Sequence, residues 1–334
     1  MKLIIQIPCY DEEAQLAETM AALPRELPGI DEIEILVIDD GSSDDTAEVA
    51  RQSGATYLLQ LPVHLGLAQA FSSGLDAALK LGADVIVNTD ADHQYPGEEI
   101  EKLLGPIMAG TADMVIGDRA PHRLQHFGLF KRALQRVGSW AVRQLSGTTV
   151  PDAASGFRAF SRRAALRLNV LTKFTYTLET IIQAGKKQIP ITHVPIRTNP
   201  ERRPSRLFSS TLTYVRRSAI TMVRIYSMYE PLRVFGMLGA IGIVSGLVIG
   251  LRFVFDYMRV GGEGHIQSLI LASVLIIIGV QTVLIGLVAD LIAGNRALIE
   301  DTLVRVRELE LRFGEGPDVA RVGPTAPSGD VPDA

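Results

Sequence analysis

The stretch Asp84–Pro96, D-V-I-V-N-T-D-A-D-H-Q-Y-P, decides the fold and points to a site. Its apolar run Val85–Val87 is typical of a short buried strand, and two carboxylates, Asp90 and Asp92, follow the end of that run. Open α/β sheets bind ligands just beyond the carboxyl ends of their strands. Oxygens such as those of Asp92 and Gln94 are ligands that Mg²⁺ and Mn²⁺ prefer. An aspartate-rich turn that caps the next helix is the alternative, because D-x-D alone is a weak signal.

Short apolar runs alternate with helical segments through the first 120 residues. Helices are expected between the runs, including Gly66–Leu81 and Gly97–Met108. Continuous buried strands joined by helices indicate an α/β fold with a mostly parallel sheet covered on both faces. The chain has neither G-x-G-x-x-G nor a P-loop lysine, which disfavours an ordinary dehydrogenase or ATPase. The expected strands are Leu3–Ile7, Glu34–Ile38, Thr56–Leu61, Asp84–Asn88 and Met114–Ile116.

Acidic clusters follow three of these strands, at Asp11–Glu13, Asp39–Asp40 and Asp90–Asp92. One carboxylate at a strand end is usually a cap, but three clusters at one edge of a sheet make a crowded anionic rim. Such a rim costs stability through like-charge repulsion unless cations or sugar hydroxyls use it. The three clusters together therefore favour a binding site over a set of caps.

The charges of the chain are distributed unevenly, although the net charge is only −4. From Arg119 to Val150 there are six basic residues and no acid, and from Arg202 to Arg233 there are seven arginines against Glu230 alone. Such fields suggest anionic partners, whether phosphate, lipid headgroup or nucleic acid. The single Cys9 excludes an internal disulfide and fits a reducing compartment.

Two long uncharged runs in the second half indicate a membrane domain at 231–293. Val234–Leu251 and Ile266–Ala289 approach or exceed the roughly 20 residues that span a bilayer, so we expect transmembrane helices at about 234–254 and 266–290. A buried core helix is the alternative for the shorter run. Arginine-rich flanks place both termini in the cytosol and the connecting loop outside, by the positive-inside rule.

Amphipathic and charged segments flank the two expected spans. Residues 205–230 combine arginines, apolar residues and tyrosines, which is typical of helices that lie in the headgroup layer of a membrane. Residues 294–313 predict a charged cytosolic helix, and 314–334, rich in Gly, Pro and Asp, predict a disordered tail. Self-association is possible through the C-terminal helix or through a small-residue strip, which alternatively packs within the chain. The strip consists of Gly242, Gly246 and Gly250.

Seven blocks of sequence resemble those of a known family. From the N-terminus they are P-C-Y-D-E-E, D-D-G-S-S-D-D-T, T-D-A-D-H-Q, G-D-R, D-A-A-S-G-F-R-A-F, V-P-I-R and R-R-P-S-R-L. In this order they resemble family 2 glycosyltransferases with the GT-A fold. Within that family they are most similar to the dolichol-phosphate-mannose-synthase-like, polyprenyl-phosphate sugar transferases. The resemblance covers roughly residues 1–230, and it implies a GT-A catalytic domain at 1–204.

The resemblance also implies roles for single residues. Asp39 would recognise the base, Asp90 would contact the ribose and sugar side, and Asp92 with Gln94 would ligate Mg²⁺ or Mn²⁺. Arg119 would lie near the transferred phosphate or acceptor and, with Asp92 and Arg202, would serve catalysis. Arg206 stands where the family often has lysine, and His93 also departs from the pattern and has no predicted role. The implied nucleotide-sugar-binding residues are Pro8, Tyr10, Glu12, Asp39, Asp90, Ala91, Arg202 and Arg206.

The basic stretch Arg119–Val150 interleaves apolar residues with arginine and lysine. We interpret it as an amphipathic acceptor segment at the membrane surface, where Arg132 or Arg136 could hold a lipid phosphate. A solvated helix with a positive face is the plain alternative. Nucleic-acid binding is a third, but the membrane segments argue against it.

The residues and the resemblance together predict a membrane-anchored, metal-dependent, inverting glycosyltransferase. It would move a hexose from a GDP- or UDP-sugar to a dolichyl- or undecaprenyl-type polyprenyl phosphate at the cytosolic face of the cell membrane. A phosphate acceptor is already anionic at neutral pH, so no side chain needs to remove a proton, and direct displacement inverts the anomeric carbon. The alternatives are transfer to a lipid or glycan hydroxyl, or a membrane scaffold with a degenerate transferase domain.

Overall fold

The sheet of the protein is built from the predicted apolar runs and from three further strands. The computed structural model describes residues 1–119, 129–171, 175–200, 211–261, 266–314 and 319–323. Within these residues one sheet has the strand order β7-β5-β6-β4-β1-β2-β3-β8. The strands are β1 (Lys2–Cys9), β2 (Glu32–Asp39), β3 (Tyr57–Gln60), β4 (Val85–Asn88), β5 (Met114–Asp118), β6 (Arg158–Ser161), β7 (Ile191–Pro195) and β8 (Ala320–Arg321).

Most neighbouring strands of the sheet are parallel. β1 pairs with both β2 and β4, β2 pairs with β3, and β5 pairs with β7, all in parallel. β6 is antiparallel and lies between β4 and β5, with Arg158 opposite both Asn88 and Ile116. The loop that precedes β6 therefore lies beside the carboxyl ends of β4 and β5. The five strands expected from the sequence are confirmed, and β6 brings a further loop to the edge where the site was predicted.

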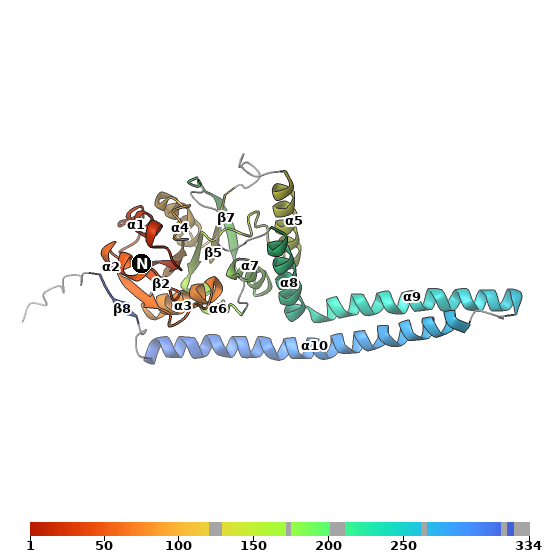
Figure 1. Cartoon of the computed structure of the whole chain (residues 1–334). Coiled ribbons are helices and arrows are strands. Elements are labelled where there is room, and N and C mark those ends of the chain that lie inside the picture. The colour runs from red at the N-terminus through yellow and green to blue at the C-terminus, as the bar shows by residue number, and fades with distance from the viewer. Residues whose placement is uncertain (120–128, 172–174, 201–210, 262–265, 315–318, 324–334) are drawn as a thin grey trace, which may run out of the picture. The chain divides into compact units, whose positions relative to one another are not determined.

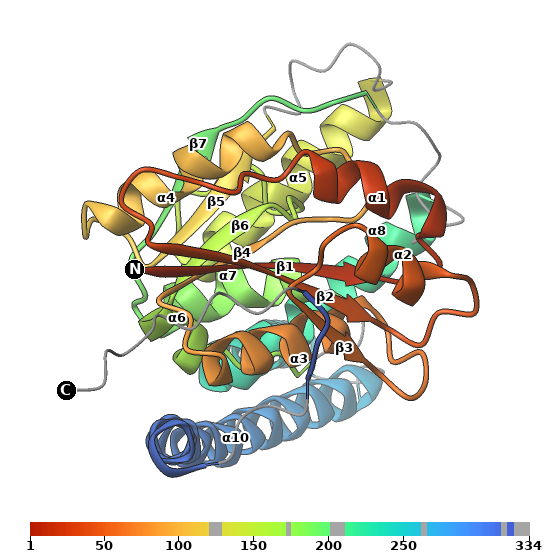
Figure 2. The ribbon, with the colours of Figure 1, turned by 90° about the vertical axis from the view of Figure 1, so that its left-hand side faces the viewer.

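Helices cover both faces of the sheet, as predicted (Figure 2). Alternate residues of β1 show the reason: Leu3 and Ile5 pack into one hydrophobic core and Ile4 into the other. A strand buried on both faces needs an unbroken apolar run. One core includes α1 (Glu13–Ala21), α2 (Thr46–Gln52) and α4 (Ile100–Met108), which a 3₁₀ turn at Gly97–Glu99 precedes. The other includes α3 (Leu67–Lys80), α5 (Leu129–Ser146), α6 (Arg162–Arg167) and α7 (Tyr176–Lys186).

The chain divides into two units, one comprising Met1–Met222 with Val304–Ala334 and the other Val223–Leu303. The second unit holds most of two long helices, α9 (Pro231–Val260) and α10 (Ile266–Phe313) (Figure 1). Helix α8 (Thr211–Tyr229) precedes them and lies where interfacial helices were predicted. Pro231 occupies the first turn of α9, where a missing N–H leaves no hydrogen bond unmade.

Both α9 and α10 are long and apolar enough to cross a membrane. Only 11% and 17% of the residues in their most apolar 18-residue windows are buried in the protein, whereas the core helix of a soluble domain would be mostly buried. The alternative of a buried core helix for the shorter run is therefore not supported. α10 runs without a break through the second expected span and the predicted helix 294–313, so the boundary predicted at 294 is not an interruption of the helix.

The glycine strip of α9 packs against α10 of the same chain. A Cβ added at Gly242 would lie 3.3 Å from the Cα of Gly279, and one added at Gly246 would lie 2.8 Å from the carbonyl oxygen of Ala272. Gly239, which the predicted strip omits, comes closer still, 2.6 Å from the carbonyl oxygen of Gly279. Of the two uses predicted for the strip, the structure therefore shows packing within the chain. Self-association stays a prediction.

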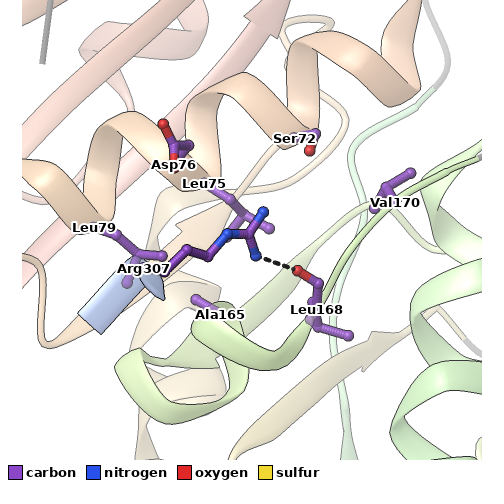
Figure 3. A pocket seen from close by; sticks show the side chains of 8 residues that line it. All are labelled: Ser72, Leu75, Asp76, Leu79, Ala165, Leu168, Val170 and Arg307. Carbon is purple, nitrogen blue, oxygen red and sulfur yellow. Dashed lines mark hydrogen bonds between the residues drawn. The ribbon is translucent and has the colours of Figure 1, made fainter. Parts of the chain in front are cut away.

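The end of α10 packs within the first unit, to which it belongs. Arg307 Nη1 donates to the carbonyl oxygens of Leu166 and Leu168, at 3.3 and 3.1 Å, and so caps the end of α6. Figure 3 shows the bond to Leu168. Lys80 of α3 and Glu310 form an ion pair of 3.0 Å. These contacts attach the last turns of α10 to α3 and α6.

Strand β8 then pairs antiparallel with β3 at the edge of the sheet. It lies within 314–334, where the composition predicts disorder, and the structure describes Ala320–Arg321 as a short strand. The backbone N–H of Val322 also donates to the carbonyl oxygen of Thr56, at 3.0 Å. Pairing with a distant strand edge supplies order that the local Gly, Pro and Asp content does not encode.

Candidate functional site

The loops that follow β1 and β2 are bonded to each other at the carboxyl edge of the sheet. Asp11 Oδ1 accepts from the backbone N–H of Ser43 at 2.8 Å, and Thr46 Oγ1 accepts from the backbone N–H of Glu12, also at 2.8 Å. Asp11 has φ +52°, a left-handed conformation in which Asp is enriched. Asp11 and Thr46 thus have a structural role, since they join P-C-Y-D-E-E to D-D-G-S-S-D-D-T.

The residues predicted to hold the nucleoside lie around these two loops. Cys9 and Asp39 are paired across β1 and β2, which places Tyr10 next to the end of β2. Asp39 is buried, and its Oδ1 accepts from the backbone N–H of Ser42 at 3.0 Å. Pro8 is buried within β1, whereas Tyr10 is 40% exposed. The structure therefore gathers Pro8, Tyr10, Glu12 and Asp39 at adjacent strand ends, and their contacts with a nucleotide remain a prediction.

The loop T-D-A-D-H-Q after β4 is fixed from both sides. The carbonyl oxygen of Ala91 accepts from Thr19 Oγ1 of α1, at 2.8 Å. On the other side, Asn199 donates its side-chain amide to the carbonyl oxygen of His93 and its backbone N–H to that of Gln94, both at 2.9 Å. Within the loop, Asp92 Oδ1 accepts from the backbone N–H of Gln94 at 3.1 Å. The predicted metal ligands therefore sit on a loop with a defined conformation.

His93, which had no predicted role, has a conformational one. Its φ is +56°, a left-handed conformation that histidine adopts more readily than most residues. Its Nε2 lies 3.7 Å from Glu18 Oε1 of α1. His93 thus turns the chain between Asp92 and Gln94 and faces α1.

A buried polar network forms the floor beneath Asp90. Asn88 Nδ2 donates to the carbonyl oxygen of Gly156 and to the Tyr176 hydroxyl, both at 2.9 Å, and Asn88 Oδ1 accepts from Gln6 at 2.9 Å. A Cβ added at Gly156 would lie 2.8 Å from each carboxylate oxygen of Asp90. Gly156 is therefore the residue that leaves room for this carboxylate.

The electrostatics of Asp90 favour a bound cation. Burial, and then the neighbouring charge of Asp92, raise the pKa of Asp90 to about 7, against the opposing charges of Arg119 and Arg158. Among the described residues, the charges of Arg119 and Arg158 do not offset burial and the charge of Asp92, so the pKa of Asp90 stays raised.

Arg119 is bound to a carboxylate that the sequence analysis did not single out. Its Nε and Nη2 donate to Asp152 Oδ2 and Oδ1, at 2.7 and 3.0 Å, in a two-pronged pair. Burial opposes ionisation of Asp152, but the Arg119 guanidinium outweighs it, so the pKa of Asp152 is lowered. The Asp152 side chain is fully buried and that of Arg119 is 17% exposed. Arg119 is thus held at the site by Asp152, and its contact with a phosphate stays a prediction.

Arg158 holds the loop 152–157 in place from below. Its guanidinium is fully buried and donates to the carbonyl oxygens of Ala153, Ser155 and Thr177 and to the Thr180 hydroxyl, at distances of 2.6 to 3.1 Å. Burial is the main reason that the pKa of Arg158 falls to about 10. The arginine of D-A-A-S-G-F-R is therefore a structural residue that shapes the loop carrying Asp152 and Gly156.

The residues at this edge of the sheet suit an open site for a divalent cation. Burial, and after it repulsion from Asp92, raises the pKa of Asp90, and a cation between two carboxylates relieves such repulsion. Among the described residues, no three His, Cys, Asp or Glu side chains converge into a closed cage. Asp92 and Gln94 would therefore supply a few oxygens and leave further positions to water or phosphate, an arrangement typical of Mg²⁺ sites that also bind substrate.

Four predicted residues lie where the structure gives no side-chain information. Arg202 and Arg206 fall at 201–210, outside the described residues. Arg132 and Arg136 belong to α5, but their side chains are also outside the described part. The roles of Arg202 and Arg206 in binding the nucleotide sugar, and of Arg132 or Arg136 in binding a lipid phosphate, remain predictions.

Four residues with a place in the site were given no individual role from the sequence: Asn88, Asp152, Gly156 and Tyr176. A polar Asn88 at the end of an otherwise apolar strand is a usable signal, because a buried amide needs partners. Asp152 and Gly156 stand in a block that was recognised as a whole. Nothing local marks Tyr176, whose hydroxyl reaches the site from α7.

Comparison with known proteins gives a consistent picture. The family model described as glycosyl transferase family 2 matches residues 4–168. A dolichyl-phosphate hexose transferase of Haloferax volcanii is 30% identical over 194 residues, which are 58% of this chain and 81% of that protein. The glycosyltransferase AglJ of the same organism is 28% identical over 311 residues, 92% of this chain and 97% of that one.

Among solved structures, glucosyl-3-phosphoglycerate synthase from Mycobacterium tuberculosis, in complex with Mn²⁺, UDP-glucose and phosphoglyceric acid, resembles the chain with a TM-score of 0.54. The identity is 22%, and the match covers 67% of this chain and 79% of that one. At this identity the likeness concerns the fold. It confirms the GT-A fold predicted from the sequence.

Proposed function

Since the chain belongs to glycosyl transferase family 2 and is a glycosyltransferase, we propose that it moves a hexose from a nucleotide diphosphate sugar to a polyprenyl phosphate. The observation that carries the proposal is the edge at β4, where Asp90 and Asp92 face each other's charge on a loop fixed by Thr19 and Asn199. A diphosphate with its divalent cation is a ligand that such an edge can use. The name of the Haloferax dolichyl-phosphate hexose transferase supports the acceptor class.

The residues at the ends of β1, β2 and β4 would bind successive parts of the donor, from the nucleoside to the diphosphate. Pro8, Tyr10 and Glu12 would line the nucleoside pocket, with Asp39 at the base. Asp90 would meet the ribose and sugar side of the donor, next to Ala91. Asp92 and Gln94 would hold Mg²⁺ or Mn²⁺, which when bound supplies positive charge to the diphosphate.

Departure of the diphosphate is the step that the site must assist. Negative charge grows on the leaving phosphate as the bond to the anomeric carbon breaks, and preorganised cationic groups stabilise that charge. Arg202 and Arg206 are the predicted partners from this chain. Arg119 already carries its counter-charge in Asp152, so its position is fixed before substrate binds.

The acceptor chemistry follows from the charge of a lipid phosphate. One of its oxygens can attack the anomeric carbon directly, because it is already anionic and has no proton to lose. The sugar–diphosphate bond breaks as the new sugar–phosphate bond forms on the opposite face, so the product is an inverted glycosyl phosphate and a nucleoside diphosphate. An alcohol acceptor would need a general base.

We further propose that α9 and α10 anchor the catalytic domain at the cytosolic face of the cell membrane. Both are long and apolar enough to span it. The arginine-rich flanks would then lie in the cytosol, with residues 205–230 at the surface and residues after 294 returning to the cytosol. A reporter fused after Arg259 should prove extracytoplasmic, and a cytoplasmic signal there would overturn this topology.

The full chain in detergent or nanodiscs, supplied with a panel of UDP- and GDP-hexoses, tests the function. Each donor is combined with Mn²⁺ or Mg²⁺ and with a short polyprenyl phosphate or the matching polyprenol. We expect mass spectrometry to find a polyprenyl-phosphate hexose with at least one donor and no product from the alcohol. Product from the polyprenol alone would instead support transfer to a hydroxyl.

The stereochemistry is checked on the same product. Proton NMR should show an anomeric configuration opposite to that of the donor, and retention would contradict direct displacement. Absence of both transfer and donor hydrolysis across the whole panel would favour the scaffold alternative.

A further inference from the structure

The loop between β3 and α3 carries a histidine that the site described so far does not use. His64 follows β3, and its side chain is 48% exposed. Its ring stacks on that of Tyr10, with ring centroids 3.8 Å apart and planes inclined by 31°. Tyr10 is itself 40% exposed. Each ring therefore covers one face of the other, and both side chains keep exposed area. They belong to the ends of β1 and β3, on either side of β2 in the sheet (Figure 2).

The position of His64 is fixed by a buried carboxylate. Asp40 Oδ2 lies 2.9 Å from His64 Nδ1, and the Asp40 side chain is 3% exposed. The same carboxylate accepts from the backbone N–H groups of Leu65 and Gly66, both at 2.8 Å, at the start of α3. Asp40 thus anchors the loop through three contacts and orients the histidine ring.

The loop also lies directly on the turn that follows Asp39. A Cβ added at Gly41 would lie 2.6 Å from the carbonyl carbon of Val63 and 2.7 Å from the backbone nitrogen of His64. Gly41 has φ +67°, so both its conformation and the close approach require glycine. The backbone of His64 is therefore held against the turn at Gly41, two residues after Asp39, the residue proposed to recognise the base.

We infer that His64 and Tyr10 form a stacking surface for the nucleobase of the donor, with Asp40 as the residue that positions His64. The inference rests on the proposed function, because it names the ligand as the base of a nucleotide diphosphate. An exposed aromatic pair with a fixed orientation suits a flat ring, and every nucleobase offers a π-face for such stacking. Asp39 alone provides acceptors at the base but no flat surface.

The test measures binding of UDP and GDP, each with Mn²⁺, by calorimetry on the full chain in detergent. His64→Ala should weaken binding of the preferred nucleotide about tenfold, in keeping with the loss of one base–aromatic stack. His64→Phe, which keeps a ring, should stay within about threefold of the wild type. Val63→Ala, which shortens an exposed neighbour outside the ring pair, is the matched control and should leave binding unchanged.

Inorganic pyrophosphate with Mn²⁺ separates the base from the diphosphate. Its binding should be unchanged in His64→Ala, because it has no base to stack. Equal weakening of pyrophosphate and nucleotide, or nucleotide binding in His64→Ala equal to that of the wild type, would overturn the inference. So would His64→Phe binding nucleotide as weakly as His64→Ala. If the wild type binds neither UDP nor GDP, the proposed function fails, and this inference with it.

Discussion

Asp90 and Asp152 belong to the same edge of the sheet, but their surroundings shift the pKa values of the two carboxylates in opposite directions. Burial disfavours ionisation of both. Asp152 has Arg119 as a two-pronged partner at 2.7 and 3.0 Å, and its pKa is lowered. Asp90 faces the charge of Asp92, and its pKa is raised to about 7. Within the described residues Asp152 has its counter-charge in Arg119, whereas we propose that a bound cation completes the charge of Asp90 and Asp92.

Metal removal should have the largest effect, because we propose that a cation compensates the charges of Asp90 and Asp92. EDTA should abolish sugar transfer, and excess Mn²⁺ or Mg²⁺ should restore it. Nucleoside diphosphate release and glycolipid formation measure this, with EDTA already saturated with Mn²⁺ as the control. Full activity of the metal-stripped enzyme would show that Asp90 and Asp92 are compensated by some other group.

Breaking the ion pair between Asp152 and Arg119 should lower the free energy of unfolding rather than remove a ligand from the site. Asp152→Asn leaves the Arg119 guanidinium largely buried without its counter-charge, and loss of one partner of a buried pair costs about 3–5 kcal/mol. Urea unfolding of the full chain in detergent measures the change. Glu48→Gln removes one partner of an exposed pair with Arg51 and should cost less than about 1 kcal/mol.

The acid limb of stability gives a further check on Asp152. Because its folded pKa is lowered, its stabilising contribution is present above the pKa of an unfolded aspartate and is lost as the pH falls through the folded value. Asp152→Asn should therefore flatten that acid limb. An unchanged acid limb, or a loss of stability as small as that in Glu48→Gln, would contradict the assigned role.

Gly156→Ala should displace the Asp90 side chain without removing the charge of Asp90 or of Asp92. The new Cβ would lie 2.8 Å from both carboxylate oxygens, and overpacking of this kind costs roughly 1–3 kcal/mol. If part of that strain displaces Asp90, the rate of transfer should fall about tenfold. Gly105→Ala, on an exposed turn of α4 with no atom within 4 Å of the new Cβ, should leave the rate unchanged. Equal rates in both variants would remove Gly156 from the site.

Replacing Arg307 should have the smallest effect, because this half-exposed arginine donates its hydrogen bonds to main-chain carbonyls. Arg307→Ala removes the donor to Leu166 and Leu168 at the end of α6, which should cost about 1–2 kcal/mol of unfolding free energy. Transfer should continue at the wild-type rate, because Arg307 is not part of the proposed site. Arg312→Ala, on an exposed position of the same helix, is the control and should change neither quantity.

The sequence could predict the parts of the fold that depend on local pattern. Val85–Val87 is unbroken because β4 is buried on both faces, and Asp90 follows it because ligands of such sheets bind at the carboxyl ends. The long apolar runs likewise predicted α9 and α10, since composition and length suffice to identify a span.

The parts that were missed depend on contacts between distant segments. Asp152 meets Arg119 only because β6 runs antiparallel between β4 and β5. The four residues of β6 do not by themselves indicate the direction of the strand. Tyr176 reaches Asn88 from 88 residues further along the chain. β8 likewise exists because the end of α10 returns to β3. A local pattern carries no information on such pairings.

The most direct test of the account is the rate of sugar transfer in Asp92→Asn at saturating Mn²⁺, compared with Asp84→Asn. Asp84 immediately precedes β4 at its other end, where its carboxylate accepts from the backbone N–H of Lys2 at 2.7 Å, a bond that asparagine can keep. We expect Asp92→Asn to fold normally and to lose about 10²–10³-fold in rate, while Asp84→Asn matches the wild type. Near wild-type transfer by Asp92→Asn would contradict the claim that the uncompensated carboxylates after β4 hold the cation and the donor.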